Sequence, residues 1–202
     1  MPKEHLTRYE QNVYLKKNLR AALERDTSLE LHYWVIRDWG RIWRFGTSGD
    51  VRANKRRFDA FRRQLDRGAV TNDSFQTIAS LSKVASFWNP EQYAIYDSRA
   101  VFSLNWLIYR FSEDKQLFPQ PVGRNKVIGE CNALLRPLYD QCTPAPWSRE
   151  NAYHKYCELL RTLSKEIYND PRPFFVEMLL FLAAKPKITG TIRTELKGLS
   201  TE

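Results

Sequence analysis

The chain has 202 residues, of which 43% are hydrophobic and 27% are charged, a composition that supports one substantial core and argues against a disordered chain. Its 32 lysines and arginines outnumber its 23 aspartates and glutamates, so the formal net charge is +9. Such a basic balance favours nucleic acid as a partner, because cations that neutralise phosphates supply most non-specific affinity. The same charge could instead serve solubility or binding to acidic surfaces in general.

Residues suited to metal or redox chemistry are sparse. Cys131, Cys142 and Cys157 are odd in number and widely spaced, and the three histidines are isolated, so neither a zinc site nor a disulfide framework is indicated. The start of the chain is polar, and the most apolar run, FFVEMLLFLAA from Phe174, contains Glu177 and is too short to span a bilayer. We therefore expect a cytoplasmic protein without a membrane segment, a metal or a cofactor.

Apolar residues recur at helical spacing along most of the chain. The expected helices, in chain order, cover residues 9–23, 28–38, 51–67, 75–88, 97–108, 122–141, 148–168 and 171–184. The best strand signal, YAIY at 93–96, is too short for a sheet of its own. The sequence predicts an all-α fold of about eight helices, in a single domain over residues 1–202 whose two ends pack around a helix–loop–helix at 75–110.

Helix-breaking and capping residues mark several of these boundaries. Gly68 follows the helix at 51–67, as a C-terminal glycine often does. Asn89 precedes Pro90 and is therefore biased away from helical backbone angles, which ends the helix at 75–88. Near the end of the chain, we expect Asp170 to cap the last helix and Pro171 to occupy its first position.

Two of the predicted helices carry a cationic face. The residues concerned are Lys16, Lys17 and Arg20 in the first helix and Lys55, Arg56 and Arg63 in the third. We expect both faces to be exposed and to hold phosphates that flank a bound nucleotide, with Arg99 as a further phosphate contact. Alternatively, both are only the wet faces of amphipathic helices, and Arg99 pairs with Asp97.

Four tryptophans offer flat surfaces on which a nucleobase could stack. Trp34, Trp39 and Trp43 are separated by five and four residues, and Trp88 ends the helix at 75–88. We expect these four residues to line a base pocket. The spacing is equally typical of core packing, which we expect for at least one of the first three.

The most specific signal is a lysine and an aspartate on either side of a short connector. Lys83 has mostly apolar neighbours on its helix, so its amine should be partly withdrawn from water, which lowers the pKa and favours the nucleophilic neutral form. Asp97 opens the next helix, where a carboxylate can cap the helix and stabilise positive charge on a sugar carbon. Singly, such residues are usually a solvated lysine and a plain cap, so the inference depends on the pair.

Around this pair the sequence resembles the helix–hairpin–helix superfamily of DNA glycosylases, and is closest to its compact bacterial members with an 8-oxoguanine-glycosylase fold. The similar segments are SKVASFW at 82–88 (lysine helix), NPEQYAIY at 89–96 (connector), DSRAVFSL at 97–104 (aspartate helix), YWVIRDWGRI at 33–42 and the closing RPFFVEMLLFLAA. The resemblance implies that Lys83 is the Schiff-base lysine and that Asp97 is the catalytic aspartate.

The chain also departs from the family pattern. The usual hairpin L-P-G-V-G, whose glycines let backbone amides approach a DNA phosphate, is replaced by TIASLS at 77–82. The interval from Lys83 to Asp97 is a few residues shorter than in familiar members, and Ser98 and Arg99 stand where histidine is common. The hairpin is therefore degenerate, so its contact with a DNA phosphate is either made by other groups or weaker.

The resemblance implies a DNA glycosylase, with or without lyase activity, that excises an oxidised or otherwise modified base in base-excision repair or in defence against phage with modified DNA. Its partner would be duplex DNA with the modified base extruded, because a stacked base cannot be reached. Two alternatives remain open: a non-catalytic nucleic-acid-binding module on the same scaffold, which the missing glycines favour, and an enzyme of DNA base hypermodification. The glycosylase chemistry requires no metal or organic cofactor, and we expect a monomer.

Overall fold

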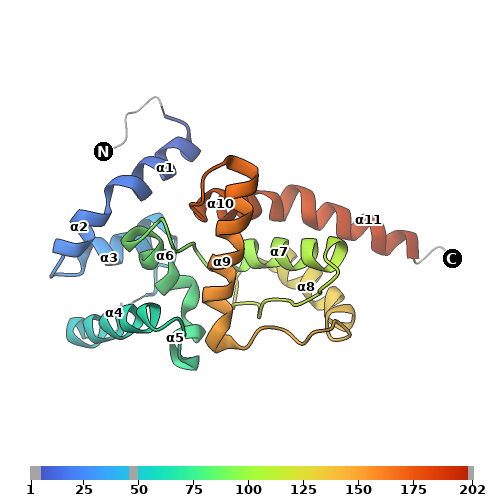
Figure 1. The fold of residues 1–202 in the computed structure, drawn as a ribbon, viewed down its shortest axis with the longest axis horizontal. Helices are drawn as coiled ribbons and strands as arrows, with labels where there is room; N and C mark the ends of the chain where they lie inside the picture. Colours follow the sequence, from blue (N-terminus) through green and yellow to red (C-terminus); the bar gives the residue numbers. More distant parts are fainter. Residues whose placement is uncertain (1–5, 46–49, 200–202) are drawn as a thin grey trace.

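Helices form all of the regular structure in the part of the chain that the computed structural model describes, residues 6–45 and 50–199 (Figure 1). In chain order the elements are α1 (Arg8–Asn18), α2 (Arg20–Arg25), α3 (Glu30–Trp34), the π-helical turn η1 (Val35–Trp39), α4 (Val51–Asp66), α5 (Asn72–Gln76), α6 (Ile78–Trp88), α7 (Ser98–Phe111), α8 (Lys126–Tyr139), α9 (Arg149–Tyr168), α10 (Phe174–Ala183), the π-helical turn η2 (Ala184–Ile188) and α11 (Thr189–Leu199). The predicted all-α fold is confirmed.

Local capping explains why α4 matches its predicted range closely. Asp50 precedes the helix, and its carboxylate accepts a hydrogen bond from the backbone N–H of Arg52 at 2.8 Å, which satisfies an otherwise unpaired donor. The helix ends just before Gly68, whose φ of 76° lies in the left-handed region that favours glycine. Both signals are local in sequence, and both appear in the structure where the sequence places them.

Two predicted helices are each divided in the structure. The helix expected over 9–23 becomes α1 and α2. The helix expected over 75–88 becomes α5 and α6, separated by Thr77, whose φ of −116° and ψ of 20° are not helical. The Thr77 hydroxyl accepts a hydrogen bond from Arg57 at 3.1 Å and donates one to the Ser74 carbonyl at 3.4 Å, and such local side-chain bonding competes with the helix.

The C-terminal part of the chain differs most from expectation. The prediction that Asp170 caps the last helix is wrong: α10 begins at Phe174, after Pro173. The Asp170 carboxylate is instead bound to the guanidinium and the backbone N–H of Arg172. Beyond Ala183 the chain continues through η2 and α11, which were not predicted because their sequence is polar and contains a proline and two glycines.

The helices form two groups that meet near the middle of the molecule. Figure 1 shows α1 to α6 on one side, α7, α8 and α11 on the other, and α9 and α10 between them. The larger apolar cluster includes α6, α9 and part of α7, and a smaller cluster includes Phe102, Trp106 and Ile128. Leu107 packs against both clusters, so α7 joins the two cores. The candidate site lies where the two groups meet.

Candidate active site

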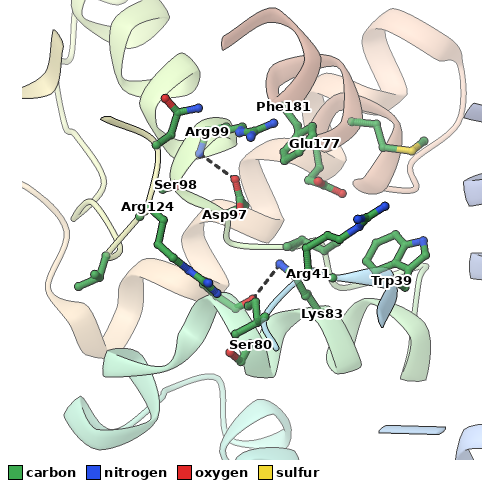
Figure 2. Close-up of a pocket in the computed structure, with 18 of the residues that line it drawn as sticks. Trp39, Arg41, Ser80, Lys83, Asp97, Ser98, Arg99, Arg124, Glu177 and Phe181 are labelled. Atoms are coloured by element: carbon green, nitrogen blue, oxygen red, sulfur yellow. Dashed lines mark hydrogen bonds between the residues drawn. The ribbon is translucent and has the colours of Figure 1, made fainter. Parts of the chain in front are cut away.

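A cavity of about 970 Å³ opens between the two groups of helices. Its walls come from α1, the end of η1, α6, the start of α7, the segment 122–127 and α10 (Figure 2). The volume is at the upper end of the range of roughly 300–1,000 Å³ that is usual for small-molecule pockets. Both Lys83 and Asp97 line this cavity.

Lys83 is held in a fixed position by its surroundings. The residue is only 5% exposed, and its Nζ donates a hydrogen bond to the carbonyl of Ala79, one turn earlier in α6, at 3.1 Å. Its aliphatic stem packs against Gly40: a Cβ atom at that glycine would lie 2.5 Å from Lys83 Cδ and 2.6 Å from Cε. The stem therefore occupies the space that any other residue at position 40 would need.

Asp97 faces the same cavity from the N-terminus of α7. Its Oδ1 accepts a hydrogen bond from the backbone N–H of Arg99 at 2.8 Å, as expected of a helix cap. Just before it, the backbone N–H of Tyr96 donates to Ser82 Oγ at 3.0 Å, which ties this segment to the residue next to Lys83. Figure 2 shows Lys83 and Asp97 reaching into the hollow from opposite sides.

The surroundings of Lys83 favour its neutral form. Burial lowers the pKa of the amine below the usual 10.5, and the nearby guanidinium groups of Arg124 and Arg99 lower it further. The carboxylates of Asp97 and Glu177 oppose this shift but do not cancel it. Among the described residues, no ion pair joins the Lys83 amine directly to a carboxylate, so no carboxylate competes at close range with a bound ligand for the amine.

Glu177 is a second carboxylate of the cavity, which sequence reasoning did not identify as a site residue. It belongs to α10, is 3% exposed, and its Oε2 lies 4.0 Å from Lys16 Nζ without a hydrogen-bond partner among the described residues. Burial raises its pKa to about 7, against the opposing effect of Lys16. The available signal was a lone glutamate in the apolar run FFVEMLLFLAA, since an ionisable residue in a buried helix requires a partner.

The prediction that Lys16 lies on an exposed cationic face is wrong. Lys16 is fully buried, donates to Ser86 Oγ at 2.9 Å, and its amine lies 5.0 Å from the centre of the Phe87 ring. Burial lowers its pKa to about 8. Lys16 therefore lies on the side of α1 that packs on α6, whereas Tyr9, near the start of α1, is 43% exposed.

The rim of the cavity is strongly cationic. The basic residues of the lining other than Lys16 and Lys83 are Arg8, Arg41, Arg99, Arg124, Lys126 and Lys185. Within the described part of the chain, the acidic residues of the lining are Asp97 and Glu177. The entrance of the cavity therefore carries net positive charge, which raises the local concentration of anionic ligands.

The tryptophans do not form the predicted base pocket together. Trp39 lines the cavity and donates from Nε1 to Asn12 Oδ1 at 3.0 Å. Trp34 and Trp43 lie outside it and are 37% and 52% exposed, while Trp88 is buried against Phe58 in the core. Their placement in the pocket is therefore wrong, because helical spacing brings only one of the first three to this wall.

A second aromatic residue lines the cavity. Phe181 of α10 borders the cavity, and the guanidinium of Arg99 lies 4.7 Å from the centre of its ring. Sequence reasoning missed Phe181, although it lies one helical turn after Glu177 and so faces the same side.

The remaining candidates for phosphate contacts lie outside the cavity, with the exception of Arg99. Lys55 pairs with Asp59 at 3.0 Å and Arg20 with Glu24 at 3.1 Å. Lys17, Arg56 and Arg63 are exposed, as expected. The helix α4, which carries Lys55, Arg56 and Arg63, is hydrogen-bonded to the α5–α6 turn through Arg57, but none of these three residues lines the cavity.

Neither a metal centre nor a membrane-spanning helix is found in the part of the chain that the structure describes. Within residues 6–45 and 50–199, no group of three or more His, Cys, Asp or Glu side chains is placed to hold a metal ion, and no helix has the length and apolar character needed to cross a membrane. Comparison of the chain with protein-family models, curated proteins and solved structures finds no match.

Proposed function

We propose that the protein is a DNA glycosylase in which Lys83 is the nucleophile and Asp97 provides electrostatic stabilisation. The observation that carries the proposal is that a buried amine and a helix-capping carboxylate reach one nucleoside-accessible cavity from opposite sides (Figure 2). Burial lowers the pKa of the amine and so increases the fraction in the neutral form, which is the form that attacks. In this proposal the Asp97 carboxylate, which lines the same cavity, stabilises the positive charge that develops on a bound sugar.

The proposed reaction has a defined electron balance. The lone pair of neutral Lys83 Nζ attacks C1′ of an extruded nucleotide, and the base leaves with the electron pair of the broken C1′–N bond. The base takes up the proton that the amine loses. The remaining lone pair on nitrogen then forms the C1′=N bond, O4′ leaves with the electron pair of the broken C1′–O4′ bond and takes a proton from solvent, and the product is a protonated Schiff base. Loss of a C2′ proton from that intermediate expels the 3′-phosphate, which is the lyase step.

The proposed substrate is duplex DNA with the target nucleotide extruded, because a base that stays stacked in the duplex cannot enter the cavity. The cationic rim, together with the net charge of +9, would hold the phosphates on either side of the extruded nucleotide. A modified base is the proposed target, since extrusion costs a few kcal/mol and costs less when pairing is already weakened. Repair of cellular DNA and defence against phage with modified DNA fit this chemistry equally.

The degenerate turn between α5 and α6 favours a second candidate, a nucleic-acid-binding module without catalysis. Thr77 occupies this turn, and the sequence there lacks the glycines that would let backbone amides approach a phosphate closely. Such a module would bind DNA with strong salt dependence and form no covalent adduct.

Borohydride trapping separates the two candidates. The protein would be incubated with a duplex that contains a natural abasic site, whose aldehyde the amine can attack whatever base was lost, and then with a panel of duplexes with modified bases. We expect a covalent adduct with wild type and none with Lys83→Gln. Lys17→Gln, which removes an exposed lysine of α1, is the matched control and should form the adduct normally. No adduct on any duplex, with salt-sensitive binding retained, would favour the module.

A further inference from the structure

Glu177 lines the cavity, but the reaction proposed for Lys83 and Asp97 gives it no role. Its side chain enters from α10, the residue is 3% exposed, and its Oε2 has no hydrogen-bond partner among the described residues. The Nζ atom of Lys16 lies 4.0 Å from this oxygen, which is beyond hydrogen-bond distance. Buried carboxylate oxygens are usually hydrogen-bonded, so an unpartnered one at a cavity wall indicates that its partner is a ligand or a reacting group.

The two carboxylates of the cavity lie in different surroundings. Asp97 Oδ1 accepts a hydrogen bond from the backbone N–H of Arg99 at 2.8 Å, and such a bond favours the ionised form. Glu177 lies on a helix whose neighbouring residues Val176 and Met178 are buried and apolar, and burial raises its pKa to about 7. Two carboxylates whose surroundings favour opposite protonation states are typical of a site in which one stays charged and the other transfers protons.

The groups that act electrostatically on Glu177 connect it to the proposed nucleophile. The amines of Lys16 and Lys83 favour its ionised form, and the carboxylate of Asp97 opposes it. On α9, burial raises the pKa of Tyr156 and of Cys157, so both stay neutral near pH 7. Figure 2 shows the side chains of Glu177, Asp97 and Lys83 entering the same hollow. Glu177 is therefore placed to exchange a proton with the amine.

We propose that Glu177 is the proton acceptor for Lys83 in the reaction at C1′. This inference rests on the proposed function, in which the Lys83 amine is the nucleophile. When the lone pair of Nζ forms the bond to C1′, the nitrogen becomes positively charged and still carries two protons. The carboxylate of Glu177 takes one of them, directly or through one water molecule, and the nitrogen regains the lone pair that forms the C1′=N bond. Glu177 then passes the proton to the leaving base, or at an abasic site to the former aldehyde oxygen, and is again a carboxylate.

The test is the single-turnover rate of borohydride-trapped adduct formation on a natural abasic duplex, measured against pH. We expect Glu177→Gln to lower the plateau rate about 100-fold, as is usual for the loss of a general base, with unchanged binding to a duplex that contains tetrahydrofuran, which has no aldehyde. Below about pH 7 two groups of the wild type must lose protons, so the logarithm of the rate should fall with a slope of about two, and with a slope of about one in Glu177→Gln. Glu158→Gln, which removes an exposed carboxylate of α9, is the matched control and should react as wild type.

A merely electrostatic role for Glu177 predicts the opposite change. Glu177 raises the pKa of Lys83, so its removal would then increase the neutral fraction of the amine and speed the reaction near pH 7. A rate for folded Glu177→Gln that equals or exceeds the wild-type rate would overturn the inference. Added formate should restore part of the rate of Glu177→Ala, whereas chloride at the same ionic strength should not, and equal effects of the two salts would also count against a proton acceptor.

The buried Lys16 loses its partner in Glu177→Gln, so thermal unfolding is measured for each variant. Lys16→Met/Glu177→Gln removes both buried charges and should be as slow as Glu177→Gln, whereas a wild-type rate for this double variant would overturn the inference. The inference and the proposed function fail in different ways. A Lys83-dependent adduct that forms equally fast without Glu177 would remove the proton acceptor and keep the nucleophile. The absence of any adduct with wild type would remove both.

Discussion

Replacement of Gly40 by alanine tests whether the position of the Lys83 amine matters. The added Cβ would lie 2.5 Å from Lys83 Cδ and 2.7 Å from the carbonyl oxygen of Ile36, whereas carbon atoms in contact are about 3.5–4.0 Å apart. The Lys83 stem must therefore move by about 1 Å, and a misplacement of that size can lower a rate about 100-fold, equivalent to about 2.7 kcal/mol in the barrier. Overpacking of this kind destabilises a protein by about 1–3 kcal/mol, so we expect the variant to remain folded.

The assay is the rate of borohydride-trapped adduct formation on a natural abasic duplex, read beside a thermal unfolding curve. Gly129→Ala is the matched control, because nothing lies within 4 Å of the Cβ that it adds on α8. The control should react at the wild-type rate. If Gly40→Ala also reacts at the wild-type rate while folded, the amine is not held in place by its packing, and the reasoning from the geometry of Lys83 is wrong.

Three further outcomes are expected. The rate of adduct formation should rise with pH and level off above the pKa of Lys83, which burial places below 10.5. Asp97→Asn removes a negative charge that raises this pKa, so it should shift the pH profile to lower pH and reduce the plateau rate. An unshifted profile would contradict an electrostatic interaction between Asp97 and Lys83. The free energy of unfolding should fall as pH rises from about 4.5 to about 7, because Glu177 binds its proton more tightly in the folded than in the unfolded chain. It should recover above about pH 8, because Lys16 binds its proton less tightly in the folded chain. The double variant Lys16→Met/Glu177→Gln should remove this minimum when the free energy of unfolding in urea is measured against pH. Arg124→Gln should weaken duplex binding and reduce the slope of log affinity against log salt by about one, while Arg136→Gln, on α8 and outside the cavity lining, should leave both unchanged.

The features that the sequence predicted well are those specified by neighbouring residues. The range of α4 follows from Asp50 and Gly68, which lie at its two ends. The burial of Lys83 follows from its apolar neighbours on α6, and the cap at Asp97 from its place before a helical run. None of these requires knowledge of a distant contact.

The features that were missed depend on residues far apart in the chain. Lys16 was expected in solvent because its partner Glu177 belongs to the last part of the chain, and periodicity alone does not show which face of α1 packs on α6. Trp88 turned inward for the same kind of reason, since its neighbour Phe58 comes from α4. A polar helix such as α11 carries too weak an apolar pattern to be detected.

The connector before Asp97, residues 89–96, is hydrogen-bonded to two helices at once, which limits how the molecule can open. Besides the bond from Tyr96 to α6, the hydroxyls of Tyr153 and Tyr156 on α9 donate to the carbonyls of Ala94 and Ile95, each at 3.0 Å. The connector cannot detach unless these helices separate, so its amides should exchange with deuterium only through global unfolding. Any adjustment to a substrate must then arise in the outer loops, while the spacing of amine and carboxylate stays constant.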